Sequence, residues 1–302
     1  MRTIILAGGY ATRLHPLTSE RAKPLLPVRG MPIITHILRS GSFPDRPIIS
    51  TNRRFGPQFE DWKQASGIDA DVVIEESFCE REKLGTIGAI AYVIETCGLD
   101  DDLLVIAGDN LFGFSLNRFL AAYRGHPLIA LHDIGSLERV RNRYGVAIVD
   151  EGRVTAFQEK PAKPRSTLVS TACYVYPRDV LRLFKEFFAT AQPGQDAPGY
   201  FNEWLLEDRH REIDPFVFED AWFDIGDRAS YIAAHRTSAS DSWIDPSATI
   251  EDSRIVDSVV LRGAQVRSST LRGCVVAEDC ILSGVDLEDC LIAENSRIAV
   301  AP

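Results

Sequence analysis

The sequence has little of several features that mark whole classes of protein. Positive charge is scarce, because 33 Lys and Arg stand against 43 Asp and Glu, and the net charge of −10 offers no basic surface for nucleic acid. No run reaches the roughly 18 apolar residues that a membrane-spanning helix needs. The apolar N-terminal run breaks at Gly8 and Gly9, too early for a signal peptide. We therefore expect a cytoplasmic protein without nucleic-acid or membrane partners.

Short motifs for metals and cofactors are also missing. The six cysteines contain no C-x-x-C pair and the six histidines no H-E-x-x-H, so neither a zinc site nor a disulfide framework is indicated. The phosphate loop G-x-x-x-x-G-K-[ST] and the dinucleotide pattern G-x-G-x-x-G do not occur either. A phosphate-bearing ligand would have to be held by a local cluster of Lys and Arg against an acidic background.

What the sequence does have is an alternation of short apolar runs with helical stretches. The runs at 2–7, 47–50, 71–76 and 103–109 are typical of buried strands, and helical stretches such as 116–124 follow them. The alternation predicts an α/β fold, with a mostly parallel sheet flanked by helices. Ligands of such sheets bind outside the carboxyl ends of the strands.

The middle of the chain is richer in strands. Residues 144–161 read as two strands joined by a turn at Asp150-Glu151-Gly152, and residues 168–177 read as another strand. We expect a strand-rich insertion beside the parallel sheet, where a second ligand could bind.

The residues from 244 onward carry an internal repeat. Ten times in succession, a small or branched residue stands two positions before an aliphatic one, in steps of 5, 5 and 6 that add to sixteen. Because alternation by two points both members of a pair inward, the repeat predicts a three-sided, left-handed parallel β-helix of the hexapeptide class. The small positions include Cys274, Cys280 and Cys290, which we expect to be core thiols. The aliphatic positions are Ile250, Ile255, Val260, Val266, Leu271, Val276, Leu282, Leu287, Ile292 and Ile298.

The segment 6–28, LAGGYATRLHPLTSERAKPLLPV, places glycines and cations directly after the first predicted strand. The Gly8-Gly9 turn lets backbone N–H groups approach a polyphosphate closely. Arg13 can form a fork onto phosphate oxygens, and Lys23 adds a point charge. Taken alone, these residues also fit a tight turn beside two surface cations.

As a whole, the segment resembles the signature of sugar-1-phosphate nucleotidyltransferases, L-A-G-G-x-G-T-R-L-x-P-L-T followed by P-K-x-L-L-P-V. Glucose-1-phosphate thymidylyltransferases and uridylyltransferases are the nearest subgroup. Ala11 stands where Gly is usual and Ala22 where Pro is usual; an alanine at 11 can still donate its N–H if its φ is negative. The resemblance implies a Rossmann-like nucleotidyltransferase domain at 1–237, and a β-helix tail, here 244–302, also occurs in several members.

Later segments match the same family in order and spacing. Gly85 lies in an L-G-T segment, residues 108–110 resemble a G-D-N turn, residues 144–145 and 159–161 resemble Y-G and E-K-P, and residues 222–226 resemble W-x-D-x-G. The resemblance implies a nucleotide site of Leu6, Ala7, Gly8, Gly9, Ala11, Thr12, Arg13 and Gly85, a sugar-phosphate site of Asn110, Tyr144, Gly145, Glu159, Lys160 and Thr171, a Mg²⁺ site of Asp109 and Asp224, and Arg13, Lys23 and Asp109 as catalytic residues.

These residue types suit the chemistry, because nucleotidyl transfer needs alignment and neutralised charge more than covalent help. We expect transfer from a nucleoside triphosphate to a sugar 1-phosphate, with Mg²⁺ and release of pyrophosphate. The resemblance favours glucose 1-phosphate with dTTP or UTP. The alternatives are GTP with mannose 1-phosphate, or CTP, and, in another class, an inactive homologue that binds a nucleotide sugar as a regulator.

The tail raises a separate question. Acyltransferases of the hexapeptide class usually need a histidine base, and no His follows His235, so we interpret the tail as structural. So short a prism has exposed coil edges and ends that usually need cover. We therefore expect a homo-oligomer to which the tail contributes, with an outward apolar stripe of Val259, Val275, Ile281 and Leu291.

Overall fold

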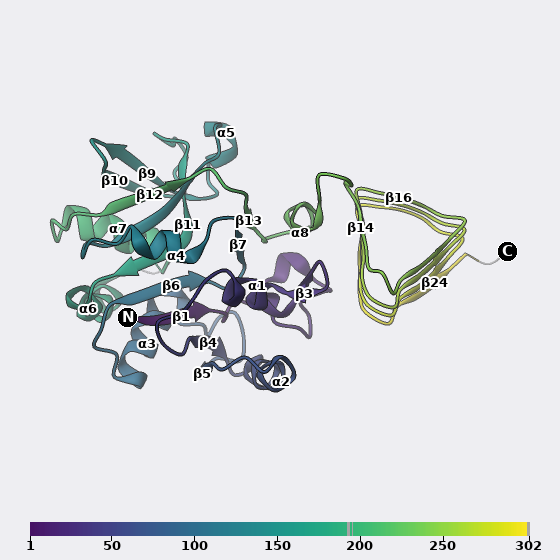
Figure 1. Ribbon diagram of the computed structural model, residues 1–302, viewed down its shortest axis with the longest axis horizontal. Coiled ribbons are helices and arrows are strands. Elements are labelled where there is room, and N and C mark those ends of the chain that lie inside the picture. Colours follow the sequence, from purple (N-terminus) through teal and green to yellow (C-terminus); the bar gives the residue numbers. More distant parts are fainter. Residues whose placement is uncertain (192–193, 195, 301–302) are drawn as a thin grey trace. The chain divides into compact units, whose positions relative to one another are not determined.

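The computed structural model describes residues 1–191, 194 and 196–300. Its main sheet has nine strands, and the parallel part of that sheet has the order β6-β1-β4-β5 (Figure 1). Helices follow two of these strands, and the predicted α/β class is confirmed. The elements of this part are β1 (Arg2–Leu6), β4 (Ile48–Asn52), α2 (Gly56–Ser66), β5 (Asp71–Glu75), α3 (Gly85–Cys97) and β6 (Leu103–Ala107).

The strands from the middle of the chain continue the same sheet. β11 (Leu168–Tyr176) pairs antiparallel with β6, and the hairpin of β9 (Gly145–Asp150) and β10 (Arg153–Glu159) lies beyond it. β8 (Leu128–Asp133) pairs with β11 and with β12 (Asp214–Phe218). The predicted hairpin is confirmed, and the strand-rich section lies beside the parallel strands, where it continues their sheet. Because β11 bonds directly to β6, these strands belong to the same sheet, and their pairings are antiparallel except for that of β8 with β12.

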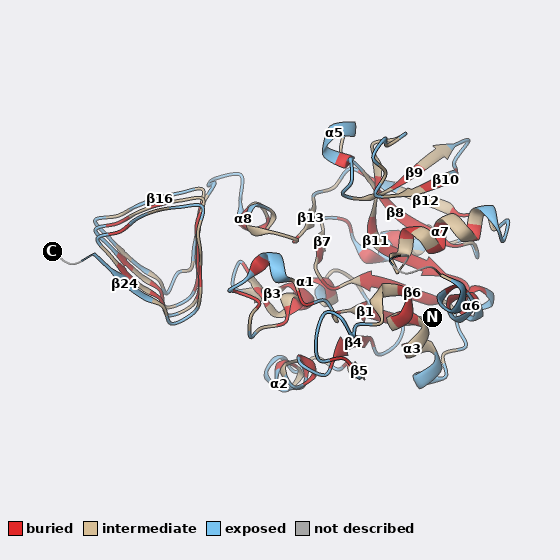
Figure 2. Ribbon diagram, turned by 180° about the vertical axis from the view of Figure 1, so that it is seen from behind, coloured by how far each residue is buried: buried red, intermediate tan, exposed pale blue. Residues whose placement is uncertain are grey.

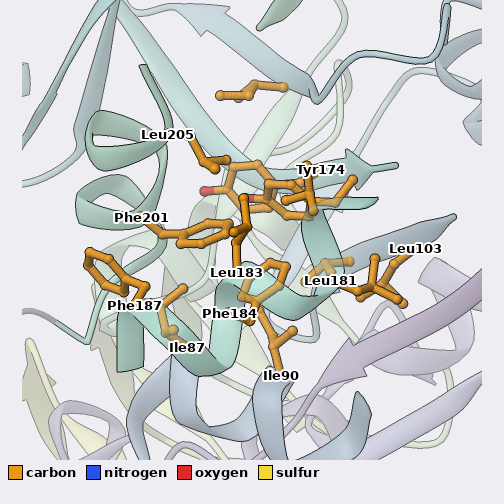
Figure 3. Close-up of a cluster of buried hydrophobic side chains, with 14 of the residues drawn as sticks. Ile87, Ile90, Leu103, Tyr174, Leu181, Leu183, Phe184, Phe187, Phe201 and Leu205 are labelled. Atoms are coloured by element: carbon orange, nitrogen blue, oxygen red, sulfur yellow. The ribbon is translucent and has the colours of Figure 1, made fainter. Parts of the chain in front are cut away.

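An aromatic core fixes two helices on this sheet, α6 (Leu181–Thr190) and α7 (Pro198–Glu207). Figure 3 shows Phe184 and Phe201 facing each other, with ring centroids 4.1 Å apart. Tyr176 is buried beside them and donates its hydroxyl to Asn202 Oδ1 at 3.0 Å. Full burial of one such side chain contributes roughly 1.5–3 kcal/mol, so this cluster holds α6 and α7 firmly.

Shorter elements make the remaining connections. No helix in the described ranges is long and apolar enough to cross a membrane. The shorter connecting elements are η1 (Thr12–Leu14), η2 (Lys23–Leu25), β2 (Pro27–Val28), β3 (Met31–Pro32), α1 (Ile33–Arg39), β7 (Asn110–Phe112), α4 (Leu116–Ala121), α5 (Leu137–Val140), η3 (Arg178–Val180), β13 (Trp222–Asp224) and α8 (Arg228–His235).

The tail is the predicted three-sided parallel β-helix (Figure 1). Strands on each face pair in register with strands sixteen residues further on, as in Ile255↔Leu271 and Val266↔Leu282. Its strands are β14 (Trp243–Ile244), β15 (Thr249–Glu251), β16 (Arg254–Val256), β17 (Val259–Val260), β18 (Gln265–Arg267), β19 (Thr270–Arg272), β20 (Val275–Val276), β21 (Ile281–Ser283), β22 (Asp286–Glu288), β23 (Leu291–Ile292) and β24 (Arg297–Ala299).

Burial along the tail follows the position of each coil. Val266, Leu271 and Val276 in the middle are fully buried, whereas Ile298 in the last described coil is 38% exposed (Figure 2). Cys274 and Cys280 are buried as expected, but Cys290 is partly exposed. Ile298, on which no further described coil stacks, is therefore less covered than the inward side chains of the middle coils.

The expected outward stripe was partly wrong. Val259 and Val275 are both fully buried, although they lie outside the inward register. Ile281 and Leu291 are partly exposed. The face made of β14, β17, β20 and β23 is therefore covered on its outer side as well, by residues of the same chain.

The corners of the prism recur with the same period. Nine residues with positive φ form three columns, each with steps of sixteen. A Cβ on Gly263 would stand 2.1 Å from Asp279 Oδ1 of the next coil, so a larger residue at 263 would require the Asp279 carboxylate to move. The columns are Asp252, Ser268 and Gly284; Asp257, Gly273 and Asp289; and Gly263, Asp279 and Asn295.

The chain divides into two compact units. The first is Met1–Gly9 with Ile37–Trp222, and the second is Tyr10–His36 with Phe223–Pro302. The segment 10–36 therefore belongs with α8 and the tail. Within this second unit, the Tyr231 hydroxyl of α8 donates to Pro27 O. The division at 1–237 and 244–302 stays a prediction about the modules of the sequence.

We predict that the second unit loses stability in mild acid because of His235. This ring is fully buried against Tyr231 and Trp243, and burial, with Arg29 and His36 nearby, lowers its pKa to about 4. The unfolded chain, with a pKa near 6.5, binds the proton more readily, so stability present above pH 6.5 falls by about 3 kcal/mol toward pH 4. Urea midpoints at pH 7.5 and 5 measure the loss.

Matched variants identify the source of that loss. His235→Asn should flatten the pH dependence, whereas His210→Asn, at an exposed histidine, should keep it. An unchanged pH dependence in His235→Asn would show that other groups cause the loss.

Candidate active site

The loop after β1 presents bare backbone at the carboxyl edge of the sheet. The Ala7 N–H donates to Ser50 O at 2.7 Å, and Asn52 Nδ2 donates to Gly8 O at 2.9 Å. A Cβ built on Gly9 would meet no atom within 4 Å, and Gly9 is exposed. The loop is therefore anchored on one side and open on the other, where backbone N–H groups can approach an anion.

Two buried polar side chains beside this loop were missed by the sequence reasoning. Asn52 is fully buried, and Glu75 is 4% exposed, with Oε1 lying 3.7 Å from the position of a Cβ on Gly8. Burial raises the pKa of Glu75, and the Ser77 hydroxyl, which donates to Oε1 at 2.7 Å, partly offsets this. A polar residue at the end of a predicted parallel strand is the signal that could have found both.

The turn after β6 starts beside the end of β1. The Gly108 N–H donates to Leu6 O at 2.8 Å, which places the next two residues at the same edge. Asn110 is buried; its Nδ2 donates to Asp109 Oδ1 at 2.8 Å, and its Oδ1 accepts from Trp222 Nε1 at 2.7 Å. Asn110 therefore orients the Asp109 carboxylate instead of facing open solvent.

Trp222 links two of the predicted motifs. Besides its bond to Asn110, its ring lies 5.5 Å from that of Tyr144, at an interplanar angle of 60°. The Tyr144 carbonyl in turn accepts from the Lys160 N–H at 3.1 Å. The indole ring therefore joins the G-D-N and Y-G segments, and the E-K-P segment joins them through the Tyr144 carbonyl.

Glu159 is held in a narrow space between two glycines. A Cβ on Gly145 would stand 2.9 Å from Glu159 Oε2, and one on Gly199 only 1.9 Å from it. The Glu159 side chain is 7% exposed, and Lys160 Nζ, on a side chain that is 56% exposed, lies 3.5 Å from Oε1. Burial raises the pKa of Glu159, and Lys160 counteracts this rise. The result is a fixed acceptor beside an exposed cation.

Two other predicted residues have mainly structural surroundings. Thr171 is fully buried and its hydroxyl donates to Ala130 O at 3.1 Å, so it supports the sheet, and we leave it out of the proposed site. Gly85 begins α3 with a φ of +73°, and a Cβ there would lie 2.4 Å from Asp196 Oδ2. Asp196 therefore lies directly against Gly85.

The second unit contributes the segment with Arg13. Ala11 has a φ of +48°, so the negative φ that an alanine was expected to have there is absent. Its carbonyl accepts from the Thr18 hydroxyl at 2.8 Å and from the Leu14 N–H at 3.0 Å. These two bonds hold a left-handed conformation that glycine would adopt with less strain. Thr12 follows as the first residue of η1.

Arg13 lies against the segment with the second predicted metal ligand. A Cβ on Gly226 would stand 3.2 Å from Arg13 Nη2, and Gly226 is two residues beyond Asp224. Arg13 is exposed, and Asp224 is partly exposed. Lys23, also partly exposed, begins η2 in the same unit. The structure therefore places an arginine beside the W-x-D-x-G segment.

The carboxylates suit a metal that is shared with a ligand. Asp109 of the first unit and Asp224 of the second are both partly exposed and offer hard oxygen donors. The described ranges contain no group of three or more His, Cys, Asp or Glu that could hold a metal by itself. Mg²⁺ needs only one or two carboxylates when phosphate oxygens and water complete its shell, so each of these carboxylates taken by itself is of a type that suits it.

Comparison with known proteins agrees with the motifs. The model of the nucleotidyl transferase family matches residues 2–241. The chain belongs to this family. Mannose-1-phosphate guanylyltransferase of Mycobacterium tuberculosis is 29% identical over 234 residues, 76% of this chain and 62% of the relative. Glucose-1-phosphate thymidylyltransferase of Streptomyces antibioticus is 26% identical over 275 residues, 89% of this chain and 75% of the relative.

A solved family structure supports the fold. The "Putative Glucose-1-Phosphate Thymidylyltransferase from Bacillus anthracis in Complex with a Sucrose" has a TM-score of 0.65 and 24% identity, covering 78% of this chain and 94% of that one. The chain spans about three fifths of the length of the guanylyltransferase relative. Family membership and fold are therefore clear.

The nucleotidyl transferase family usually has Gly where this chain has Ala11, and we predict that Ala11→Gly stabilises the protein. A left-handed conformation costs a residue with a Cβ about 1 kcal/mol, which the glycine avoids. Urea unfolding measures the gain. Ala89→Gly, in the interior of α3, is the control and should lower stability by about 1 kcal/mol. Lower stability in Ala11→Gly would mean that the loop relaxes away from this conformation.

Proposed function

We propose that this chain transfers a nucleotidyl group from a nucleoside triphosphate to a sugar 1-phosphate. The observation that carries the proposal is the position of Arg13 against Gly226, beside Asp224, within a family whose signature the chain keeps. The open backbone at Gly9 supports it, because a polyphosphate needs bare N–H groups as well as cations. The relatives named above are enzymes of this reaction class.

The proposed reaction is an in-line displacement. A phosphate oxygen of the sugar 1-phosphate attacks the α-phosphorus, the bond from the α-phosphorus to the bridging oxygen breaks, and pyrophosphate leaves. Arg13 and Lys23 neutralise the charge that develops on the leaving pyrophosphate. Mg²⁺, held by Asp109 and Asp224, would supply further charge neutralisation when bound.

The sugar 1-phosphate is assigned to the Glu159 side of the first unit. Lys160, whose side chain is exposed, can meet the sugar phosphate, and the buried Glu159 carboxylate can accept hydrogen bonds from sugar hydroxyls. The Glu159 side chain lies between Gly145 and Gly199, which leaves it little freedom to rotate into another conformation. Tyr144 is held by Trp222, which also holds Asn110, so this side is prearranged.

For the substrates, we propose glucose 1-phosphate with dTTP or UTP. The overall signature supports this choice, and the thymidylyltransferase relative spans 89% of the chain. GTP with mannose 1-phosphate is the second candidate, because a relative of higher identity is a mannose-1-phosphate guanylyltransferase. An inactive regulatory homologue is disfavoured, because such proteins usually lose the loop arginine or a metal carboxylate and this chain keeps Arg13, Asp109 and Asp224.

Pyrophosphate release from five nucleoside triphosphates, each with glucose 1-phosphate or mannose 1-phosphate, tests the proposal. We expect the highest kcat/KM for dTTP or UTP with glucose 1-phosphate, and no release with EDTA present. A preference for GTP with mannose 1-phosphate would reject the substrate choice. No release in any combination, with nucleotide sugar still bound, would favour the inactive homologue.

Variants test the residues in the same assay. Arg13→Ala, Asp109→Asn and Asp224→Asn should each lower kcat/KM by about 10²–10³-fold, because each removes charge stabilisation made in the transition state. Asp208→Asn changes an exposed carboxylate at the end of α7 and should leave the rate unchanged. Near-normal rates in both Asp109→Asn and Asp224→Asn would reject the metal-site assignment.

The proposal includes a homo-oligomer to which the tail contributes. Ile298 and Val300 of the last described coil are 38% and 64% exposed, and an unpaired coil edge favours association. Light scattering of the full chain should give a mass above one copy, which Ile298→Asp with Val300→Asp lowers. Phe78→Asp, at a residue 60% exposed in the first unit, is the control and should not. A monomeric wild type would reject the oligomer.

A further inference from the structure

Three arginines hold one face of the β-helix, the face made of β14, β17, β20 and β23. Two arginines bind the corner that precedes this face in the sequence. Arg236, the residue after α8, pairs with Asp257 at 2.5 Å, and Arg228 pairs with Asp289 at 2.6 Å. At the corner that follows this face in the sequence, Arg21 pairs with two glutamates of successive coils. Both corners of the face are therefore tied, which agrees with the complete burial of Val259 and Val275 on its outer side.

Arg21 has the most extensive contacts of the three. Its Nη1 lies 2.6 Å from Glu278 Oε1 and its Nη2 lies 2.7 Å from Glu294 Oε2. Glu278 is only 12% exposed and Arg21 is 29% exposed, so this ion pair is less screened by water than one on an open surface. Burial lowers the pKa of Arg21, but the two glutamates outweigh it and the pKa is raised. The guanidinium therefore stays charged and bound to both coils.

Arg21 also differs in its place in the sequence. It lies two residues before Lys23 and eight after Arg13, inside the segment that the family signature covers. Ala22 between Arg21 and Lys23 is fully buried, and its carbonyl accepts from the Leu25 N–H at 2.9 Å to close η2. The backbone from Ala22 to Leu25 is therefore a closed turn that contains Lys23, and Arg21 precedes it directly. A change in the position of Arg21 must be transmitted to Lys23.

We infer that Arg21 is a positioning residue: by binding Glu278 and Glu294 it makes the β-helix hold the backbone from which Lys23 acts on the triphosphate. The inference rests on the proposed function. It gives the tail a part in nucleoside triphosphate binding, while the residues that we assign to the triphosphate all lie outside the tail. The sugar 1-phosphate is assigned to residues of the other unit, so its binding does not depend on Arg21.

The test compares Arg21→Gln with Arg236→Gln in the full-length protein. Each variant removes one arginine tie from the same face, but only Arg21 belongs to the signature segment. We expect Arg21→Gln to raise the KM for the nucleoside triphosphate about tenfold while the KM for the sugar 1-phosphate stays within twofold. Arg236→Gln should leave both KM values unchanged. The double variant Glu278→Gln with Glu294→Gln should reproduce Arg21→Gln, and adding it to Arg21→Gln should cause no further rise.

Hydrogen exchange of the Leu25 and Leu26 amides provides a readout besides activity. Both N–H groups bond within η2, so Arg21→Gln should speed their exchange about tenfold and Arg236→Gln should not. Equal exchange or equal KM changes in the two arginine variants would mean general destabilisation and would overturn the inference. A wild type that releases no pyrophosphate rejects the proposed function and the role of Arg21 in it. Faster exchange of the Leu25 and Leu26 amides in Arg21→Gln would still show that the contact of Arg21 with the tail holds η2.

Discussion

The pairing of β1 between β4 and β6 is the constraint on which the first unit depends. Leu6 pairs with Ser50 on one side and Ala107 on the other, so three strands reach the same edge at the same level. Ile4 and Ile5 are fully buried, which makes any shift of this register costly. The Gly8 loop, Asn52 and the turn at Asp109 then follow from where their strands end.

Charge is arranged locally against the acidic background of the chain. The buried charged groups beside the predicted motifs are carboxylates, Glu75 and Glu159, whose pKa values burial raises. The exposed ones include cations, Arg13 and Lys160. Fixed acceptors beside reachable cations are the arrangement that a ligand with both hydroxyl and phosphate groups requires. An overall charge of −10 is therefore compatible with phosphate ligands.

Local patterns predicted most of the fold because they depend on local physics. Apolar runs gave the strands, and a step of sixteen gave the β-helix, since both record which side chains face inward. Pairing between distant strands left no such record, so the prediction placed the middle strands beside the parallel sheet but missed the pairing of β11 with β6.

The predicted site shows the same limit. The motifs identified Asp109, Tyr144 and Trp222, but not that the indole of Trp222 contacts Asn110 and Tyr144, because 112 residues separate Trp222 from Asn110. The φ of Ala11 was also out of reach, since it depends on the hydroxyl of Thr18 seven residues later. Arg21 and Glu278, which are 257 residues apart, have no sequence pattern in common at all.

Because of its three corner columns, the tail can change its length only by whole coils of sixteen residues. Each coil repeats the same corners after sixteen residues, and each strand bonds only to the coil before and the coil after. Insertion of a complete coil would leave every corner and inward position in phase, whereas a single added residue would put all later corners out of phase with their glycines and aspartates. Evolution can therefore lengthen or shorten this module by duplication of one coil, provided that the coils carrying Glu278 and Glu294 are kept.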